Sequence, residues 1–435
     1  MPFASGEAFA DDAPKTEWIR SYGGEGNDVI YSVSPTSDGG IIAAGSSHSS
    51  KGDVEFHRGA GDSWLLKLDR DGNVQFKRSL GGSANDYAFS AAETEDGGYV
   101  AAGATSSSDG DFGGRSGRDS DPWVVRLNRW GHTQWLRTYG TAREDFGKYV
   151  FPEPGGGYVL LGSAVSPGRG IGCEIREGSL FPWAALIAED GSVLGESCLG
   201  GGPGRSSGDF FYRLFASRAE GYPVAFAGSA YDRKDRSAPF SGKVGPGGDI
   251  RGLRAIPAQG ARTVLGVSAL RGGALEGVGH RGAVLRTGRE CPPPWLFRVG
   301  HQGGLDWEAE LEEADGCAEL SSVARYGGGL AAAGFRWRPG ETGSGARDAS
   351  VLMAGPGGEI IWELAVKGGS GDRVTGLAQL KDGGLAAAGD TYSRDGDFAF
   401  RGPSAAPEGA EEGDAFVIRL APAEAVSKGL PKRSP

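Results

Sequence analysis

A short glycine-rich unit recurs seven times along this chain: two glycines or a near equivalent, two to four apolar residues, and a closing glycine. The clearest copies span residues 38–45, 96–103 and 382–389, and weaker copies close at Gly162, Gly228, Gly279 and Gly334. Successive closing glycines are 58, 59, 66, 51, 55 and 55 residues apart. Regular steps of this size are typical of stacked or radial repeats. The chain is therefore predicted to be one repeat array rather than a set of unrelated domains.

Each repeat is interpreted as four β-strands joined by glycine turns, because glycine permits the positive φ of tight hairpins. In the second copy the expected strands are 87–92, 99–104, 123–127 and 133–138. The third strands are apolar except for a basic residue near their ends, at Lys67, Arg126, Arg298 and Arg419. This pattern predicts one solvated face for the third strand. No stretch of 11 or more residues has a helical period, so the chain is predicted to be all-β.

The two ends of the chain indicate how the array closes. After Leu420 there is no turn glycine and no fourth strand, whereas residues 17–24 resemble a fourth strand with no third strand before it. If the first strand completes the last repeat, the ring closes and its open sheet edges disappear. The chain is therefore predicted to be a seven-bladed β-propeller of four-stranded blades, closed by its N-terminal strand. A linear solenoid is the alternative, but solenoids need distinct polar caps rather than complementary missing strands.

Charge and hydropathy argue against some partners. The 435 residues include 45 basic and 56 acidic side chains, and the net charge of −11 repels phosphate backbones and anionic lipid surfaces. Nucleic acid is therefore not an expected partner. No run of 18 apolar residues exists, so membrane insertion is not expected either.

The N-terminal segment suggests export. Residues 8–10 are Ala-Phe-Ala followed by two aspartates, which has the small-x-small form of a signal-peptide cleavage site. The expected location is therefore secreted, periplasmic or at the cell surface, and an unstructured Ala-rich tail is the alternative. The expected limits are 1–16 for a flexible N-terminal tail, 17–421 for the propeller and 422–435 for a C-terminal tail.

The fullest copies carry the pattern Trp-x-x-x-Tyr-Gly-Gly-x-x-x-Asp, then Asp-Gly-Gly-Tyr-x-x-Ala-Gly, then Asp-x-Trp-x-x-Lys-Leu-Asp-x-x-Gly. This pattern resembles the repeats of bacterial secreted and cell-surface β-propellers. Residues 18–69, 76–127 and 362–420 match it well, whereas the third to sixth copies keep only the glycines and the strands. The resemblance implies an exported propeller, of a kind sometimes found beside carbohydrate-active modules. It brings no catalytic motif.

In a four-stranded blade the loops after strands two and four lie on one face of the disc, and aspartates recur in both. Those after the fourth strands are Asp28, Asp86, Asp145, Asp209 and Asp372. Those after the second strands include Asp53 and two Asp-Gly-Asp pairs, Asp109 with Asp111 and Asp395 with Asp397. The first set is a candidate ligand-binding ring at the mouth of a central channel, and the two pairs are candidate Ca²⁺ ligands. The alternative is that each aspartate caps its own turn, since neither pair has the spacing of a dedicated calcium loop.

Tryptophan at a fixed strand position is more often part of a core than a platform for a sugar. Such residues begin the third strands at Trp64, Trp123, Trp183 and Trp295, and they are predicted to pack between blades. Trp130 in a turn and Trp337 after a closing glycine break the pattern. These two are candidate surface contacts for a protein or a glycan.

The chain has four cysteines, which permit three disulfide pairings. Cys173 and Cys198 fall in the third repeat, and Cys291 and Cys317 fall in the fifth, with each pair expected on the same face. The predicted disulfides are therefore 173–198 and 291–317, which agrees with export. Free buried thiols are the alternative.

No Gly-x-Ser-x-Gly elbow, phosphate-binding loop or His-x3-His spacing is present. The expected function is therefore a non-catalytic binding or scaffold module, a monomer that recognises a protein or glycan at the cell surface. The alternative is a glycoside hydrolase or lyase with paired carboxylates at the central channel. A structural spacer within a cell-surface assembly is the third hypothesis.

Overall fold

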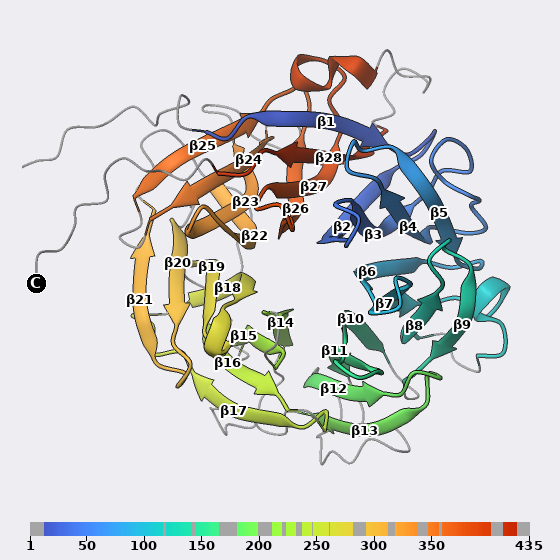
Figure 1. Cartoon of the computed structure of the whole chain (residues 1–435), viewed down its shortest axis with the longest axis horizontal. Helices are drawn as coiled ribbons and strands as arrows, with labels where there is room; N and C mark the ends of the chain where they lie inside the picture. Colours follow the sequence, from blue (N-terminus) through green and yellow to red (C-terminus); the bar gives the residue numbers. More distant parts are fainter. Residues whose placement is uncertain are drawn as a thin grey trace, which may run out of the picture.

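The computed structural model describes residues 13–115, 119–140, 144–164, 181–198, 211–219, 223–231, 237–245, 247–260, 262–281, 293–311, 318–337, 347–355, 359–401 and 412–423. The named β-strands in this part of the chain form seven antiparallel sheets of four strands each. Figure 1 shows the sheets as blades around a common axis. The innermost strands are β2, β6, β10, β14, β18, β22 and β26. The prediction of an all-β, seven-bladed propeller is confirmed.

The first three blades follow one another along the chain, each listed here from the ring axis outward. Blade 1 contains β2 (Asp28–Pro35), β3 (Ile41–Ser47), β4 (Asp62–Leu68) and β5 (Val74–Leu80). Blade 2 contains β6 (Asp86–Glu93), β7 (Tyr99–Thr105), β8 (Asp121–Leu127) and β9 (Thr133–Thr138). Blade 3 contains β10 (Asp145–Pro152), β11 (Tyr158–Ala164), β12 (Phe181–Ile187) and β13 (Val193–Cys198).

The other four blades have the same strand order. Blade 4 contains β14 (Phe211–Ser217), β15 (Ala225–Tyr231), β16 (Ser237–Val244) and β17 (Ile250–Ala255). Blade 5 contains β18 (Arg262–Ala269), β19 (Leu275–Arg281), β20 (Pro294–Val299) and β21 (Leu305–Glu310). Blade 6 contains β22 (Ala318–Tyr326), β23 (Gly329–Trp337), β24 (Arg347–Ala354) and β25 (Ile360–Val366). Blade 7 contains β26 (Asp372–Gln379), β27 (Leu385–Thr391), β28 (Asp414–Leu420) and β1 (Thr16–Tyr22).

Helical structure is limited to short 3₁₀ turns in the described residues. These are η2 (Gly110–Phe112), η3 (Arg271–Gly273) and η4 (Gly396–Arg401). Within the same residues, no helix has the length and apolar character needed to cross a membrane.

The ring is closed by the strand that comes first in the chain. β1 pairs antiparallel with β28, with Trp18 opposite Arg419 and Tyr22 opposite Ala415. The two strands lie side by side although they come from opposite ends of the sequence (Figure 1). β1 is therefore the outermost strand of blade 7, as the complementary deficits at the two chain ends predict.

The closing glycine of the repeat lies where two strands approach closely. A Cβ added at Gly45, Gly103 or Gly389 would lie 1.7 to 1.9 Å from a carbonyl oxygen of the innermost strand in the same blade. No side chain fits at such a distance, so the position requires glycine. The most regular residue of the repeat is thus a steric requirement of the blade.

Large apolar side chains fill the space between blades. Trp64, Trp123, Trp183 and Trp295 are at most 1% exposed, which confirms the prediction that they belong to the core. Each lies near the start of a third strand, where the neighbouring blades cover both faces of the sheet.

The third strands have no solvated face in blades 1, 2 and 7, so that prediction from their basic residues was wrong. Lys67, Arg126 and Arg419 are buried. Each forms an ion pair with an aspartate in the first hairpin of its own blade: Asp38, Asp96 and Asp382 respectively. A buried cation needs such a partner, because an unpaired charge inside the fold is strongly destabilising.

Candidate functional site

Four of the five aspartates predicted to form a ligand-binding ring occupy the same place in their blades. Asp28, Asp86, Asp145 and Asp372 are each the first residue of an innermost strand, and each is at most 1% exposed. The fifth, Asp209, lies outside the described residues. The repeat therefore brings these four carboxyls to one face of the ring, but below its surface.

In three of these blades, the carboxylates of Asp28, Asp86 and Asp372 link the end of the second strand to the adjoining loops. Asp28 accepts hydrogen bonds from the Ser47 and Ser49 hydroxyls and from the Gly24 N–H, which is 2.8 Å away. The equivalent hydroxyl donors are Thr105 and Ser107 for Asp86, and Thr391 and Ser393 for Asp372. The carboxylate oxygens are thus occupied by contacts that hold the fold together.

The two Asp-Gly-Asp pairs predicted as Ca²⁺ ligands bond to the same entering loops. Asp109 accepts from the Ser83 N–H at 2.7 Å, and Asp111 accepts from the Gly81 N–H at 3.0 Å. In blade 7 the corresponding acceptors and N–H donors are Asp395 with Gly369 and Asp397 with Lys367. Among the residues that the structure describes, no group of three or more His, Cys, Asp or Glu side chains could hold a metal ion. Calcium binding by these four aspartates stays a prediction.

We call the set of contacts around each entering loop a clasp, and it recurs in blades 7, 1 and 2. In blade 1 it consists of Asp28, the buried hydroxyl of Ser49, Gly52 with a φ of 80°, and Val54, which enters the core. The equivalents are Asp86, Ser107, Gly110 and Phe112 in blade 2, and Asp372, Ser393, Gly396 and Phe398 in blade 7. The clasp aspartate is the one that follows the Gly-Gly of the repeat pattern in the first, second and seventh copies.

The two tryptophans predicted as surface contacts are not brought together. Trp130 is 65% exposed in the turn between β8 and β9, and the Arg129 guanidinium lies 5.6 Å from its ring centroid. Trp337 is half-buried at the end of β23 and packs edge-on against Phe335, with ring centroids 4.7 Å apart. They belong to blades 2 and 6 and lie at opposite ends of their blades, so one small ligand cannot contact both.

The predicted disulfides fall mostly outside the described residues. Cys198 ends β13, opposite Trp183. Cys173, Cys291 and Cys317 lie outside the part of the chain that the structure describes. The pairing therefore stays a prediction.

Burial changes the acidity of the clasp carboxyls. It raises the pKa of Asp28 and of Asp372 to about 6, although the hydrogen bonds from the neighbouring hydroxyls oppose the change. Burial also raises the pKa of Asp86, and the nearby Asp62 carboxylate adds to the effect. The hydroxyl donors replace the solvation that these groups lose in the fold.

Replacing Asp28 with alanine should destabilise the protein by about 2–3 kcal/mol, because buried hydroxyl and N–H donors then lack an acceptor. Urea denaturation of the Asp28→Ala variant measures this loss. The matched control is Asp71→Ala, which removes an exposed aspartate from the β4–β5 turn and should change stability by less than about 0.5 kcal/mol. Equal stabilities for the two variants would contradict the bridging role of Asp28.

Lowering the pH from about 7.5 to about 5 should stabilise the protein by roughly 1 kcal/mol for each of Asp28 and Asp372. The pKa of each carboxyl is about 6 in the folded protein and near 3.8 in the unfolded chain. Between these values the folded protein therefore binds protons that the unfolded chain does not. Below about pH 4 the trend should reverse. Burial raises the pKa of Asp38, but hydrogen bonds from Lys67 and Thr36 outweigh this effect and lower the pKa to about 2. Protonation of Asp38 at low pH progressively removes the stabilisation that these bonds provide.

Thermal unfolding at constant ionic strength tests this pH profile. The melting temperature should be highest between about pH 4 and pH 5, and the Asp28→Asn variant should show a shallower rise on acidification. A maximum at pH 7 or above would show that the buried carboxyls do not control the profile.

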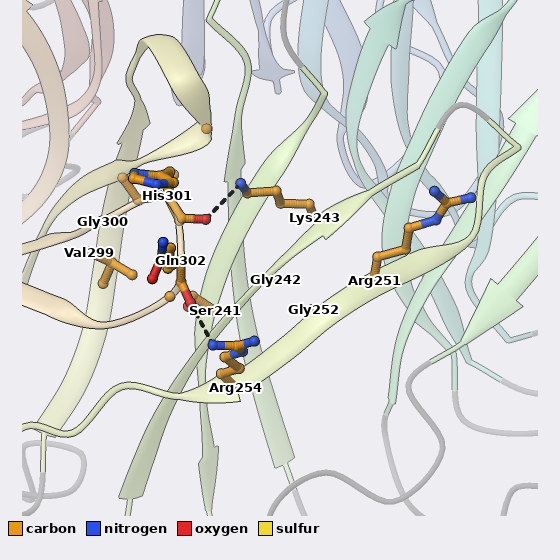
Figure 2. Close-up of a pocket in the computed structure, with 13 residues that line it drawn as sticks. Ser241, Gly242, Lys243, Arg251, Gly252, Arg254, Val299, Gly300, His301 and Gln302 are labelled. Atoms are coloured by element: carbon orange, nitrogen blue, oxygen red, sulfur yellow. Dashed lines mark hydrogen bonds between the residues drawn. The ribbon is translucent and has the colours of Figure 1, made fainter.

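An open pocket of about 160 Å³ lies between blades 4 and 5. Its walls come from β16 and β17 and from the turn at residues 300–303, which joins β20 to β21. Figure 2 shows Lys243 and Arg254 reaching this turn from neighbouring strands. Lys243 Nζ donates to the His301 carbonyl at 3.2 Å, and Arg254 Nη1 donates to the Gln302 carbonyl at 2.7 Å. The described residues that line the pocket include no Asp or Glu, and none of them was predicted as a site residue.

Comparison with known proteins identifies the fold. No family model and no curated protein matches the sequence. The structure is similar to the polysaccharide lyase Uly1, with a TM-score of 0.52 and 10% identity over 92% of this chain and 90% of that one. It is also similar to a mutant puromycin hydrolase complexed with PGG, with a TM-score of 0.50 and 13% identity over 83% of this chain. The match covers 50% of the hydrolase, so this chain spans half the length of that enzyme. At these identities the similarity shows the propeller fold alone.

Proposed function

We propose that this chain is a non-catalytic, exported binding or scaffold module that recognises a protein or glycan at the cell surface. The observation that supports this proposal most is the contrast between two parts of the ring. The clasp carboxylates are buried and hydrogen-bonded, whereas the pocket between blades 4 and 5 is open and lined by cationic side chains and glycines. Such a pocket can receive a ligand, but its described lining has no carboxylate pair for glycoside cleavage.

Export is supported by the sequence. The small-x-small segment at residues 8–10, the resemblance to secreted and cell-surface propeller repeats, and the cysteine spacing all agree with it. Alkylation in denaturant without prior reduction, followed by intact-mass measurement, tests the disulfide part of the proposal. Two disulfides leave no thiol to alkylate, whereas four free thiols would add four alkyl groups.

A glycan array tests the recognition, run once with Ca²⁺ and once with EDTA. Saturable binding to one class of glycan would support a glycan-binding module. Loss of that binding in EDTA would assign a metal role to the Asp109–Asp111 or Asp395–Asp397 pairs. A blank array would leave a protein as the ligand. Depolymerisation of a bound glycan would overturn the non-catalytic part of the proposal.

A carbohydrate-active enzyme is the second candidate function. A carboxyl group with a pKa of about 6, as at Asp28 and Asp372, suits general acid–base catalysis near neutral pH. The structural similarity to the polysaccharide lyase Uly1 is compatible with this role. However, both carboxyls are at most 1% exposed, which keeps a polysaccharide away from them. Release of new chain ends from a polysaccharide, abolished in a folded Asp372→Asn variant, would favour the enzyme.

A further inference from the structure

We propose that the pocket between blades 4 and 5 binds a single oxyanion, a carboxylate, sulfate or phosphate group, through Lys243 and Arg254. This assignment extends the proposed binding function by naming a ligand chemistry. It is supported by two departures from the repeat: one opens the pocket, and the other leaves Lys243 without an ion pair among the residues that the structure describes.

The first departure is Gly252. In blades 1 and 2 the residue opposite the third-strand cation is aromatic: Phe76 opposite Lys67, and Trp135 opposite Arg126. Trp307, Trp362 and Trp18 hold this place in blades 5, 6 and 7. In blade 4, Arg254 pairs with Ser241 as Arg78 pairs with Leu65, and counting back along the strand puts Gly252 in the place of Phe76. A register shift then sets Arg251 opposite Lys243, so this cation also has no aromatic residue opposite it.

The missing aromatic ring leaves space at the boundary between blades. Phe76 lies against the turn glycine of the next blade, since a Cβ added to Gly131 would lie 2.5 Å from the Phe76 ring. By contrast, a Cβ added to Gly252 would meet no heavy atom within 4 Å. The pocket therefore occupies the space that an aromatic side chain fills in the more regular blades.

The second departure concerns Lys243, which holds the place of Lys67 in its blade. Lys67 is neutralised by Asp38, three residues before the start of β3. The corresponding residue in blade 4, three before Val224, is Gly221, which lies outside the described residues. Lys243 donates to the His301 carbonyl and forms no ion pair within the part of the chain that the structure describes.

Arg254 adds a second cationic group on the same turn. Its bond to the Gln302 carbonyl repeats the way Arg137 contacts the Asp190 carbonyl of the next blade. A guanidinium has five N–H donors, so this bond leaves others for a ligand. Arg251 contributes less, because it already pairs with Asp249. The ammonium of Lys243 and the guanidinium of Arg254 thus converge on consecutive carbonyls, 301 and 302 (Figure 2).

The two cationic groups and the small volume of the pocket indicate the charge and size of the group that it can bind. Ammonium and guanidinium groups form their strongest hydrogen bonds with carboxylate, sulfate and phosphate oxygens. The pocket volume of about 160 Å³ is below the roughly 300–1,000 Å³ of sites that enclose a drug-sized ligand. It therefore suits one charged group, with the rest of the ligand outside.

Titration of the full chain with inorganic sulfate, inorganic phosphate and acetate, followed by NMR at constant ionic strength, tests the proposal. Saturable binding of at least one of these ions at a single site is expected, and the ion with the highest affinity identifies the preferred group. The Lys243→Gln variant should weaken this binding about tenfold or more. Its charge-matched control is Lys381→Gln, in the β26–β27 turn of blade 7, which should leave the affinity unchanged.

A third variant, Gly252→Trp, introduces the aromatic residue that blades 1, 2, 5, 6 and 7 have at this position and should abolish binding while both cations remain. Gly252 has a φ of 62°, which a tryptophan adopts only with strain, so circular dichroism must first show that this variant folds. If it does not fold, the comparison of the wild type with Lys243→Gln decides the question. Absence of saturable binding, or equal affinity in the wild type and Lys243→Gln, would overturn the proposal. Ion binding together with a blank glycan array would contradict glycan recognition but not this pocket. Glycan binding without saturable ion binding would contradict the pocket but not glycan recognition.

Discussion

Removal of residues 1–22 should cost about 5 kcal/mol or more of folding free energy, a large part of the 5–15 kcal/mol typical of whole proteins. The truncation removes β1 and with it the closure of the ring. It leaves β28 as an open edge with unpaired N–H and C=O groups, next to Phe416 and Ile418, which are at most 1% exposed in the intact protein. Open apolar edges of this kind promote association between chains. We therefore expect loss of cooperative unfolding and concentration-dependent aggregation.

Denaturant unfolding and light scattering measure both effects. A synthetic peptide covering residues 13–24, added in trans, should restore part of the stability because it can pair with β28. A truncation of residues 1–12, which leaves β1 intact, serves as the matched control. An unfolding midpoint unchanged by the longer truncation would contradict closure by β1.

Replacement of Arg419 with methionine should destabilise the protein by about 3 kcal/mol, toward the lower end of the cost of breaking a buried ion pair. Arg419 is 1% exposed and connects three elements. Its Nε donates to Glu17 of β1 at 2.6 Å, its Nη2 donates to Asp382, and its Nη1 donates to the Gly39 carbonyl in blade 1 at 3.3 Å. The substitution removes the cation that Glu17 and Asp382 share at the seam of the ring and leaves Asp382 only the exposed Arg70.

The control for this variant is Arg70→Met. Arg70 also lies near Asp382, at 3.5 Å, but it is 59% exposed, so its loss should cost less than about 1 kcal/mol. Chemical denaturation of both variants at one salt concentration provides the comparison. If Arg419→Met were as stable as Arg70→Met, the buried network would contribute nothing to ring closure.

The fold could be predicted because the same glycine and apolar positions recur in every blade. Gly45 and its equivalents recur for a steric reason, and the fourth strand missing after Leu420 is supplied by β1. The solvation of the third strand was predicted wrongly. A basic residue in an apolar strand usually marks a wet face, but Lys67 lies between two blades and is neutralised by Asp38 from the preceding hairpin. The spacing along the sequence does not show which strands are covered on both faces.

The candidate site could be predicted only where it repeats. The position of Asp28 on a common face follows from the repeat, but its burial and its bonds to Ser47 and Ser49 depend on packing between loops that are far apart in sequence. The pocket residues Lys243 and Gly252 escaped prediction because their signal is a departure from the pattern. An alignment of blade 4 with blades 1, 2 and 7 on the third-strand cation would have revealed Gly252 and Gly221 in the places of an aromatic residue and an aspartate.

The third-strand cation and the aromatic residue opposite it recur in several blades. The changes that distinguish blade 4 could therefore be introduced at the equivalent positions of another blade. Exchanging Trp135 for glycine and Asp96 for asparagine in blade 2 would remove the aromatic residue opposite Arg126 and the carboxylate that pairs with it. Anion binding by this variant would show whether a second site can be built in another blade. A disc with several such openings around its rim could hold one long anionic polymer at several points. Each contact would then raise the effective concentration of the next, so that weak individual sites would give high avidity. The number of anion-binding sites on one molecule could thus be varied by substitutions in individual blades.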